Sequence, residues 1–522
     1  MANIEKYAIG EQDFRIIRSG CYVYVDKTNY IAKILQDGGR YYFLARPRRF
    51  GKSLFLSTLR YFFEGRRELF KGLYVDAVDW DWTEFPVLHL DLNREKYAEP
   101  DKLDAVLDKV FREWEEKYKI EVKDTNLPQR FQTIIEEAHR KTGRRVVVLV
   151  DEYDKPLVGN INNEDNFEHY RTKLGGIYSN FKSSAPHLQL VFLTGVSRFS
   201  KLSVFSDLNN LNDITFNEKF ADICGITQKE LTGYFQEGIS KLAETEEIGI
   251  EEAMKELKRN YDGYRFTAKG SDTYNPWSLL NSMDASKISD YWNDTGMPTL
   301  VAESLKRVDA DLEDTFDTYC TVSDLKGLDL LNPNPIALLY QTGYLTIKDY
   351  DRESDSFRLG IPNREVKRGF FKILVPYYVK NRPLSGNQLI QAVVRHFMFG
   401  NPERAMKSLQ AYFAGIDYTM RIENENNFHN AFYLLIDMIG LDTETEHHTS
   451  EGRIDIVIKT KRFIYVIELK YDRSAEEALQ QIEEKHYPRK FYGDNREIIL
   501  IGASFSSRSR CIESWKIKTV KQ

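Results

Sequence analysis

The chain has few cysteines and no long apolar run. It has four cysteines in 522 residues, with no C-x-x-C pair among them: Cys21, Cys224, Cys320 and Cys511. We therefore expect reduced thiols rather than a disulfide framework or a cysteine zinc site. No apolar run is long enough to span a bilayer, and the first residues lack the apolar core of a signal peptide. These absences favour a cytoplasmic protein without a membrane partner.

A strong net charge is also missing. The 73 basic and 79 acidic residues give a formal net charge of −6. No overall field therefore draws the protein onto a polyanion, and any contact with nucleic acid must come from a local basic surface. With 42% hydrophobic and 29% charged residues, the composition is that of a globular protein. Because the chain is too long for one hydrophobic core, two or three domains are expected.

Short apolar segments alternate with amphipathic ones from about residue 22 to residue 215. The predicted strands are Tyr41–Ala45, Val87–Leu92, Val146–Val150 and Leu188–Thr194. The third is apolar at every position, as expected of a strand that is buried on both faces of a parallel sheet. This alternation predicts a doubly wound α/β domain.

The remaining chain has a different texture. Beyond residue 220, Gln228–Leu242 and Ile250–Tyr261 are predicted helices, and Ile336–Thr342 precedes two short strands at 343–347 and 357–361. That order predicts a winged-helix-like segment. A helical connector follows at about 376–420. The predicted elements after it are a helix at 424–439, a strand-turn-strand at 454–469, a helix at 475–485 and a strand at 497–502. We predict domains at 1–220, 221–375 and 376–522.

The segment RPRRFGKS, from Arg46 to Ser53, lies between a predicted strand and the predicted helix Leu54–Phe63. This is the context of a Walker A loop, G-x-x-x-x-G-K-S. Its backbone N–H groups and the helix N-terminus can surround phosphates. Lys52 would reach the β- and γ-phosphates, and the Ser53 hydroxyl would ligate Mg²⁺.

One position departs from that pattern, because Arg46 replaces the first glycine. The loop must turn differently there or carry strain, and the three arginines would add positive charge near the phosphates. The residues predicted to bind nucleotide are Arg46, Pro47, Arg48, Arg49, Phe50, Gly51, Lys52 and Ser53.

Polar residues follow two of the predicted strands. Asp151 and Glu152 follow the third, where Asp151 would hold Mg²⁺ and Glu152 would polarise the attacking water. The alternative is an acid pair at the start of a helix. Thr194 ends the fourth strand and is a candidate sensor of the γ-phosphate. Arg198 is a candidate phosphate contact or a solvated arginine.

Five segments in this order carry a resemblance. YVDKT at 24–28, RPRRFGKS, VDEYD at 150–154, LTGVSRFS at 193–200 and YDGYRF at 261–266 resemble the AAA-ATPase-like family of bacterial proteins. This family is related to archaeal ATPases and to the STAND branch of P-loop proteins. The resemblance covers most of residues 1–365, and the family tolerates the missing first glycine. It implies ATP binding and hydrolysis, with YVDKT a candidate frame for the adenine. STAND-like relatives often self-associate, so a homo-oligomer is a further expectation.

A second cluster of charged residues lies near the C-terminus, in GRID at 452–455 and IELK at 467–470. Side chains two apart on a strand share a face, so Glu468 and Lys470 point the same way. If the turn pairs Ile458 with Phe463, Asp455 lies diagonal to Glu468, within roughly 7–8 Å. Two such carboxylates suit Mg²⁺ or Mn²⁺, and Lys470 would position or deprotonate water. The alternative is a surface hairpin with exposed charges.

GRID and ELK on a hairpin between two helices resemble the PD-(D/E)XK nuclease superfamily, over about residues 376–522. The resemblance implies a restriction-endonuclease-like fold, in which an acid on the first helix often completes the metal site. Glu425 is the candidate for that acid. Gln481, with Tyr487 beyond it, matches the helix motif that orients the site. His447 and His448 are expected in a loop, and without a third ligand they do not support zinc.

The leading hypothesis has a P-loop NTPase sheet, a helical and winged-helix-like middle segment, and a small nuclease-like α/β domain. ATP binding and hydrolysis would control a C-terminal Mg²⁺- or Mn²⁺-dependent endonuclease that acts on DNA. The alternative is a nucleotide-switched scaffold whose C-terminal domain binds nucleic acid or protein without cleaving it. Basic residues that could contact phosphates, or form an ordinary solvated face, are Lys459, Lys461, Arg462, Arg473, Arg489 and Lys490.

Overall fold

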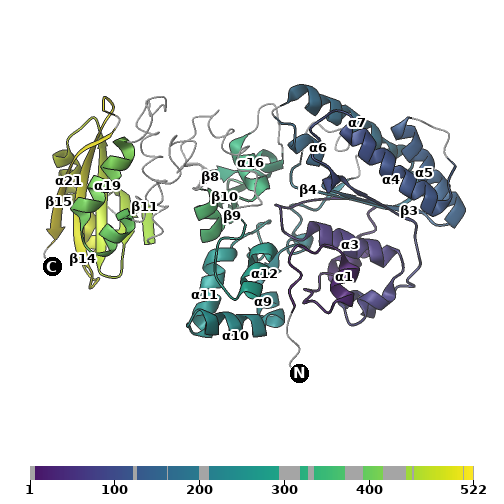
Figure 1. Cartoon of the computed structure of the whole chain (residues 1–522), viewed down its shortest axis with the longest axis horizontal. Coiled ribbons are helices and arrows are strands. Elements are labelled where there is room, and N and C mark those ends of the chain that lie inside the picture. The colour runs from purple at the N-terminus through teal and green to yellow at the C-terminus, as the bar shows by residue number, and fades with distance from the viewer. Residues whose placement is uncertain are drawn as a thin grey trace. The chain divides into compact units, whose positions relative to one another are not determined.

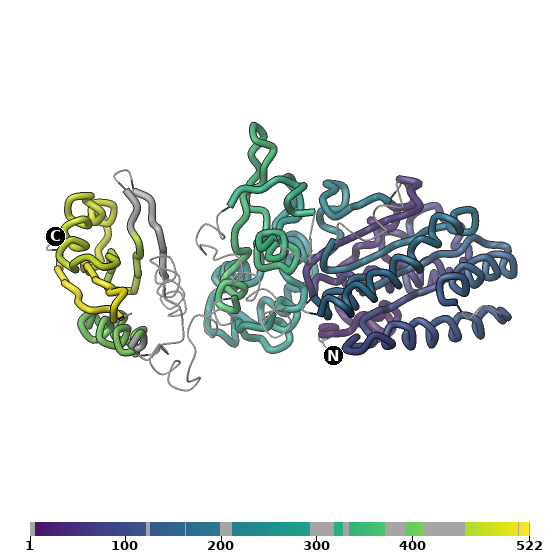
Figure 2. Tube along the Cα trace, turned by 90° about the horizontal axis from the view of Figure 1, so that it is seen from above, coloured from purple at the N-terminus to yellow at the C-terminus, as the bar shows by residue number. Residues whose placement is uncertain are grey.

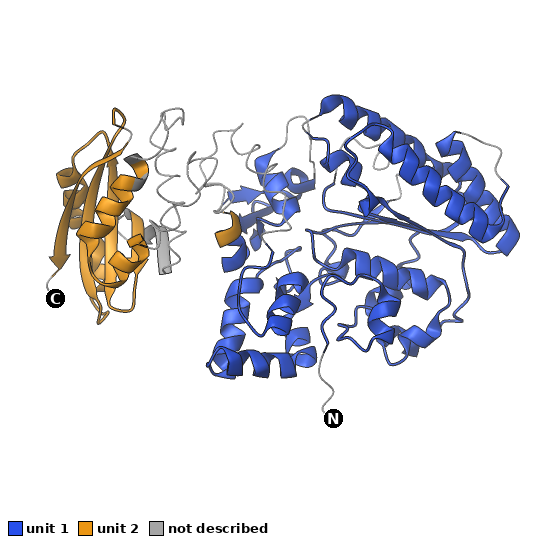
Figure 3. Cartoon of the chain, viewed as in Figure 1, with its two compact units in different colours: residues 1–297, 316–367 blue, residues 298–315, 368–522 orange. Residues whose placement is uncertain are grey.

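The computed structural model describes residues 6–121, 126–161, 163–198, 211–292, 318–326, 334–370, 392–414, 442–449, 452–509 and 511–520. The chain divides into two compact units (Figure 3). The first comprises residues 1–297 and 316–367, and the second comprises residues 298–315 and 368–522. Within the described residues, no helix is long and apolar enough to cross a bilayer.

A five-stranded parallel sheet forms the centre of the first unit, with the strand order β2-β3-β4-β1-β5. The strands are β1 (Tyr41–Ala45), β2 (Val87–Asp91), β3 (Val146–Asp151), β4 (Leu188–Gly195) and β5 (Asn212–Asp213). Every residue of β1 and β3 is buried, because helices cover both faces of the sheet (Figure 1). The predicted α/β sheet is confirmed, and each of the four predicted strands is present to within one residue.

Two groups of helices cover the sheet (Figure 1; Figure 2). One face carries α1 (Phe14–Ser19) and α3 (Lys52–Phe63), and the other carries α4 (Lys102–Tyr118), α5 (Leu127–Thr142), α6 (Lys155–Val158) and α7 (Glu164–Ser183). The helix α2 (Asn29–Asp37) precedes β1. Short 3₁₀ turns are η1 (Arg67–Phe70), η2 (Tyr74–Ala77), η3 (Leu92–Arg94), η4 (Ala185–His187) and η5 (Glu218–Phe220).

Local sequence explains where these helices begin and end. α5 starts at Asn126, whose side chain accepts a hydrogen bond from Gln129 N, and it ends at Gly143 with φ 68°. α3 begins two residues before the predicted Leu54, so Lys52 and Ser53 belong to its first turn. The N-terminus of α3 therefore lies directly after the RPRRFG turn.

The middle segment belongs to the same compact unit. It contains α9 (Gln228–Tyr234), α10 (Gln236–Thr245), α11 (Ile250–Tyr261) and α12 (Pro276–Ala285), with the short strands β6 (Ile226–Thr227) and β7 (Thr273–Tyr274). The predicted helix 228–242 is two helices, because the chain breaks at Phe235. That side chain is buried in a cluster with Leu231, Leu257 and Leu279, so core packing there replaces a continuous helix.

The predicted winged-helix-like part follows. α15 (Val322–Lys326) and α16 (Pro335–Thr342) accompany an antiparallel sheet of β8 (Thr318–Cys320), β10 (Ser356–Gly360) and β9 (Thr346–Asp351), in that order. The helix and β10 match the prediction to within one residue, whereas β9 begins three residues later than the predicted strand 343–347. The strand β8 was not predicted, because three residues give too short a pattern.

The second unit has a five-stranded mixed sheet, in the order β11-β12-β13-β14-β15. Its strands are β11 (Asp442–Thr449), β12 (Gly452–Lys459), β13 (Phe463–Tyr471), β14 (Glu497–Ser506) and β15 (Cys511–Val520). Only β13 and β14 are parallel neighbours. α19 (Pro402–Ala414) packs on one face, and α21 (Ala475–Glu484) with η7 (Tyr487–Phe491) packs on the other.

Two edge strands of this unit were not predicted. β11 contains His447 and His448, which we expected in a loop, and it pairs with β12 along eight residues of each strand. Its polar sequence, DTETEHHT, conceals the strand from a pattern search. β15 is the other edge strand, and its alternating burial reflects one covered face. The predicted helix 424–439 lies outside the described residues.

Candidate active sites

The loop from Arg46 to Ser53 connects β1 to α3 and lines a cavity of about 440 Å³. Within this loop, only Arg49 and Gly51 have positive φ, 67° and 90°. The turn therefore uses left-handed residues near its end, and Arg46 carries no such strain. Arg48, Arg49, Lys52 and Ser53 all line the cavity, which places three cationic side chains at its wall.

Arg46 does not add its charge to this cavity. Its side chain is 2% exposed, and its guanidinium donates hydrogen bonds of 2.9 Å to Ala45 O and 2.8 Å to Thr215 O. The group also lies 4.2 Å from the ring centre of Phe266. The expectation of charge near the phosphates is wrong for this arginine. Buried carbonyls require donors, and a guanidinium supplies five N–H groups to meet that need.

Two apolar residues attach the loop to the middle segment. Phe50 is buried and packs edge to face against Tyr264 and Phe266 of YDGYRF, with ring centres 4.7 and 5.4 Å apart. Pro47 lies against Gly343, at the end of α16. A Cβ atom on this glycine would lie 2.8 Å from Pro47 Cβ, so the close approach requires glycine. The motif YDGYRF therefore has a structural role, as a support of the loop.

The side chain of Lys52, the first residue of α3, folds back against the loop. Its ammonium group donates hydrogen bonds of 2.9 Å to Arg46 O and 3.0 Å to Pro47 O, and the residue is 5% exposed. Both bonds hold the amine beside the N-terminus of α3. Phosphate oxygens there would meet a cation, backbone N–H groups and the positive end of a helix dipole.

The strand order brings Glu152 to the same cavity and sets Asp151 beside the end of β4, although Asp151 and Thr194 are not among the residues that line the cavity. β4 lies between β1 and β3, and the carboxyl ends of these parallel strands share one edge. Thr194 Oγ1 donates a hydrogen bond of 2.6 Å to Asp151 Oδ1, and both side chains are buried. Glu152 has φ 49° and lines the cavity with Lys52. Its carboxylate also lies 3.8 Å from Lys155 Nζ.

The residues that line the cavity also differ from the predicted nucleotide-binding residues at Asn93 and Arg198. Asn93 follows β2 and lines the cavity beside Glu152. We did not predict it, although its position directly after a predicted strand is a usable signal. Arg198 does not line this cavity. Its Nε lies 3.0 Å from Asp213 Oδ2, and its backbone N–H donates to Gln341 Oε1. The geometry therefore gives no support to a phosphate contact by Arg198.

Residues from chain segments before β1 and after β5 also line the cavity. Tyr24, Val25 and Lys27 of the predicted adenine frame line it. Apolar residues that also line the cavity are Ala8, Ile17, Val23, Ile223, Ile226, Phe235 and Leu280. A ligand with both anionic and apolar parts matches a cavity that is lined by cationic and apolar side chains.

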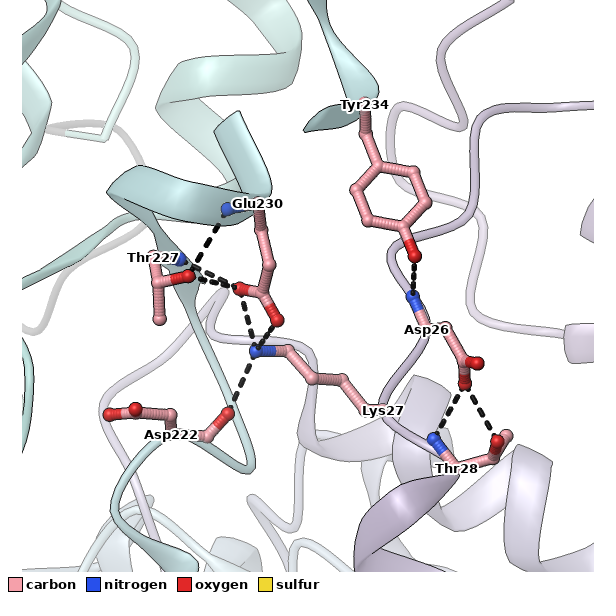
Figure 4. Close-up of polar contacts among 7 residues, drawn as sticks. All are labelled: Asp26, Lys27, Thr28, Asp222, Thr227, Glu230 and Tyr234. Atoms are coloured by element: carbon pink, nitrogen blue, oxygen red, sulfur yellow. Dashed lines mark hydrogen bonds and ion pairs between the residues drawn. The ribbon is translucent and has the colours of Figure 1, made fainter. Parts of the chain in front are cut away.

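The YVDKT segment is attached to the first helix of the middle segment (Figure 4). Lys27 Nζ lies 2.7 Å from a carboxylate oxygen of Glu230 and donates a hydrogen bond of 2.8 Å to Asp222 O. Glu230 also forms a capping box with Thr227 at the start of α9. The ion pair thus joins a wall of the cavity to the helix that begins the middle segment.

The second site lies on the β12–β13 hairpin, where the register differs from our prediction. Ile458 pairs with Tyr465 and not with Phe463. Thr460 N donates to Phe463 O at 2.8 Å, and Thr460 Oγ1 accepts from Phe463 N at 2.9 Å. The turn therefore has two central residues instead of four. A shift of two residues leaves every side chain on its predicted face.

The corrected register brings the two carboxylates closer than the predicted diagonal. Continued by one pair, it sets Asp455 opposite Glu468, and Asp455 Oδ2 accepts a hydrogen bond of 2.8 Å from Leu469 N. Lys470 Nζ donates to Glu468 Oε1 at 3.2 Å. Gln481 of α21 donates to the same oxygen. The structure thus brings the hairpin triad and the glutamine together on the α21 face of the sheet.

Glu468 is the buried centre of this site. It is 1% exposed, and Oε2 has no hydrogen-bond partner among the described residues. Burial, with a smaller contribution from the charge of Asp455, raises the pKa of Glu468 to about 7. An unpartnered buried carboxylate oxygen beside a second carboxylate fits a hard divalent cation. The described residues contain no group of three His, Cys, Asp or Glu side chains suited to a metal, and Glu425 lies outside them.

The basic residues proposed as phosphate contacts are not gathered at this site. Lys461 and Arg462 form the hairpin turn, and Glu468 is five residues beyond Phe463 on β13, roughly 17 Å along the strand. Arg473 follows β13 at the same end as Lys470 and is exposed. Lys461 and Arg462 therefore form the solvated end of the hairpin, and Arg473 lies five residues after Glu468 in the chain.

Comparisons with known proteins give a family match in each half of the chain. Residues 8–205 match the family described as "Predicted AAA-ATPase", and residues 423–515 match the PD-(D/E)XK nuclease superfamily. The chain is thus an AAA-ATPase-like protein fused to a PD-(D/E)XK nuclease superfamily domain. It is 33% identical over 528 residues to the "Uncharacterized protein in vnfD 5'region" of Azotobacter chroococcum mcd 1, with 99% of each chain covered. The chain belongs to the same family as that protein.

Proposed function

We propose that the protein hydrolyses ATP in its first unit and that nucleotide state controls a Mg²⁺-dependent nuclease in its second unit, with DNA as the substrate. One observation carries the proposal: the loop after β1 and the turn after β3 line a single cavity with Lys52, Ser53 and Glu152. A cation for phosphates, a hydroxyl and a carboxylate are the groups that phosphoryl transfer from ATP to water requires.

In this mechanism the triphosphate binds along the loop, with Lys52 at the β- and γ-phosphates. Ser53 and Asp151 would hold Mg²⁺, which when bound neutralises charge on the phosphate oxygens. Glu152 orients the attacking water and accepts its proton as the γ-phosphoryl group leaves ADP. Thr194, hydrogen-bonded to Asp151, reports the state of the γ-phosphate to β4.

At the second site, Asp455 and Glu468 would hold the divalent cation, whose charge stabilises the pentavalent phosphate transition state when it is bound. Lys470, within hydrogen-bonding distance of Glu468, orients water or accepts its proton. Gln481 fixes the Glu468 carboxylate through Oε1, and the other oxygen, which has no partner among the described residues, would be left for the cation. The product would be a cleaved phosphodiester bond.

The contacts of the loop support nucleotide control. Phe50 and Pro47 pack against Tyr264 and Gly343 of the middle segment. A rearrangement of the loop on phosphate binding would therefore displace residues of that segment directly. Control of the nuclease by this route is a proposal about coupling, and it requires that ATP change the rate of cleavage.

The first test measures ATP binding and phosphate release by the full chain. We expect Lys52→Ala to weaken nucleotide affinity at least about 10-fold, and Glu152→Gln to bind normally but to hydrolyse at least about 100-fold more slowly. Asp165→Asn, an exposed acid on α7, is the matched control and should behave as wild type. Unchanged affinity in Lys52→Ala would remove the ATP assignment.

The second test measures cleavage of supercoiled plasmid with Mg²⁺ or Mn²⁺, with and without ATP. Glu468→Gln and Lys470→Ala should abolish cleavage. Lys461→Ala, at the far end of the hairpin, is the control and should retain it. If wild type and the two site variants behave alike, the nuclease proposal fails. If cleavage occurs at the same rate with and without ATP, nucleotide control fails.

A nucleotide-switched scaffold is the second candidate function. It is favoured by the small number of carboxylates at the second site, since the described residues supply only Asp455 and Glu468 there. In that case, the second unit would bind nucleic acid or protein without cutting. ATP-dependent retention of DNA in a gel-shift assay, together with an intact plasmid, would favour this function over the nuclease.

A further inference from the structure

The turn after β3 is hydrogen-bonded to the turn after β4 through a buried carboxylate. Asp154, the last residue of VDEYD, is 2% exposed. Its Oδ2 accepts hydrogen bonds of 3.0 Å from Val196 N and 2.7 Å from Ser197 N. Two backbone N–H groups on one carboxylate oxygen form a charge-assisted contact, which is stronger than a contact between neutral groups.

The neighbouring Tyr153 strengthens the same junction. Its backbone N–H donates to Thr194 O at 3.0 Å, and its hydroxyl donates to Ser197 O at 2.8 Å. Gly195 lies between these contacts. A Cβ atom on Gly195 would lie 2.6 Å from the Tyr153 ring and 2.7 Å from Asp154 Oδ1, so the junction closes only around glycine.

The junction also reaches the phosphate-binding loop. Gly195 O accepts a hydrogen bond of 3.2 Å from Arg46 N, at the first residue of the loop. Residues 195–197 therefore join the ends of three strands. These are β1, which leads into the loop, β3, which ends at Asp151, and β4, which contains Thr194. Asp154 holds this segment from the β3 side, where Glu152 precedes it by two residues.

Glu152 depends on such a support. Its φ of 49° is a left-handed conformation, which is sterically unfavourable for a residue with a side chain. A strained residue keeps its conformation only where its surroundings fix it. On one side, Asp151 belongs to β3, and on the other side Tyr153 and Asp154 are fixed by four hydrogen bonds, one to β4 and three to the turn after it. These bonds set the direction in which the Glu152 carboxylate enters the cavity.

We infer that Asp154 is a positioning residue for ATP hydrolysis, which holds Glu152 toward the attacking water by fixing the β3 turn to the β4 turn. The inference rests on the proposed ATPase activity. Asp154 does not touch the nucleotide in this account. Its removal should therefore lower the turnover number while leaving nucleotide affinity nearly intact.

The charge of Asp154 gives a signature that packing alone would not. The pKa of Asp154 is raised to about 6, chiefly by burial and also by the charge of Glu152, against the lowering effects of the Ser197 N–H group and Lys52. Tyr178 is the other ionisable group that faces it. Protonation of the carboxylate weakens both contacts with the backbone of 196 and 197. Turnover of wild type should therefore fall as the pH drops through about 6.

The experiment compares wild type, Asp154→Asn, Asp154→Ala and Asp165→Asn in the full chain. We would measure the affinity of a fluorescent ATP analogue, kcat, KM and the pH profile of kcat. We expect kcat to fall about 10-fold or more in both Asp154 variants, with nucleotide affinity within about twofold of wild type. Asp154→Asn, which keeps an acceptor but not the charge, should lose the decline near pH 6. Asp165→Asn should match wild type.

Several outcomes would overturn the inference. It fails if Asp154→Asn keeps the wild-type kcat and pH profile, or if affinity and kcat fall together in proportion to lost folded protein. If Asp154→Ala does not fold, the pH profile of the asparagine variant decides. Failure of the ATPase proposal gives a different result. In that case Lys52→Ala and Glu152→Gln would release phosphate at the same rate as wild type.

Discussion

The hydroxyl of Thr194 donates a hydrogen bond of 2.6 Å to Oδ1 of Asp151, although the two residues are 43 positions apart in the chain. The contact arises because β4 is the neighbour of β3 in the sheet and both strands end at the same edge. A buried carboxylate that accepts a hydrogen bond from the neighbouring strand is held in one orientation. A carboxylate ligand of Mg²⁺ requires such a fixed orientation.

Thr194→Val should therefore slow ATP turnover about 10-fold, because it keeps the shape of the side chain and removes the donor. Leaving Asp151 short of a partner should also lower the free energy of unfolding by about 1–3 kcal/mol. Thr194→Ser retains the hydroxyl and should remain close to wild type. Steady-state phosphate release and urea unfolding measure the two effects. Equal turnover in the valine and serine variants would contradict the prediction.

The ion pair between Lys27 and Glu230 should stabilise the attachment of the middle segment. Glu230→Ala removes both the ion pair and the capping box of α9, and we expect it to cost about 1–3 kcal/mol of unfolding free energy. The exposed Glu237 of α10 provides the control, Glu237→Ala, which should cost less than about 0.5 kcal/mol. A double-mutant cycle with Lys27→Met isolates the pair. A coupling energy near zero would show that the cap alone matters.

Stability of the second unit should depend on pH through Glu468. Its pKa is raised from 4.5 to about 7, so the folded chain holds the proton more tightly than the unfolded chain does. The stabilisation is complete below about pH 4.5 and is lost as the pH rises through about 7. Glu468→Gln should remove up to about 3 kcal/mol of this pH dependence.

Calorimetric unfolding of the full chain at pH 5 and pH 8, for wild type and Glu468→Gln, measures that difference. Addition of Mg²⁺ at pH 8 should raise the unfolding temperature of wild type, because a cation replaces the lost proton at the buried carboxylate. The variant should respond less. Identical pH dependence in the two proteins would rule out Glu468 as the titrating group.

Gly502→Ala should disrupt the second site without touching its polar residues. Gly502 pairs with Glu468 across β13 and β14, and a Cβ atom there would lie 2.5 Å from both Ala475 O and Leu479 N of α21. The helix would have to move, which should cost about 1–3 kcal/mol and withdraw Gln481 from Glu468. Gly493→Ala, with open space at its Cβ, should be neutral. Hydrogen exchange of α21 in the two variants distinguishes them, and equal protection would contradict the prediction.

Much of the architecture followed from short-range patterns. A strand that is buried on both faces must be apolar throughout, so the sequence VVVLV at Val146–Val150 predicted β3. The phosphate-binding loop at 46–53 was recognisable because phosphate binding requires a tight turn, followed by a lysine and a hydroxyl at the start of a helix. Patterns failed where the signal was short, as in the three residues of β8, or polar, as in β11, which contains His447 and His448 and has no apolar residue.

The sequence by itself determined the central parallel strands, the residue types of both candidate sites and the face of the hairpin on which Glu468 and Lys470 lie, because these depend on neighbours within a few residues. Only the tertiary structure decided that Thr194 contacts Asp151, that Arg46 turns inward and that Asp455 stands opposite Glu468. Those facts depend on strand order, on carbonyl groups supplied by residues as far away as Thr215, and on a turn closed by the Thr460 side chain. A linear pattern does not record which distant groups will share one buried space.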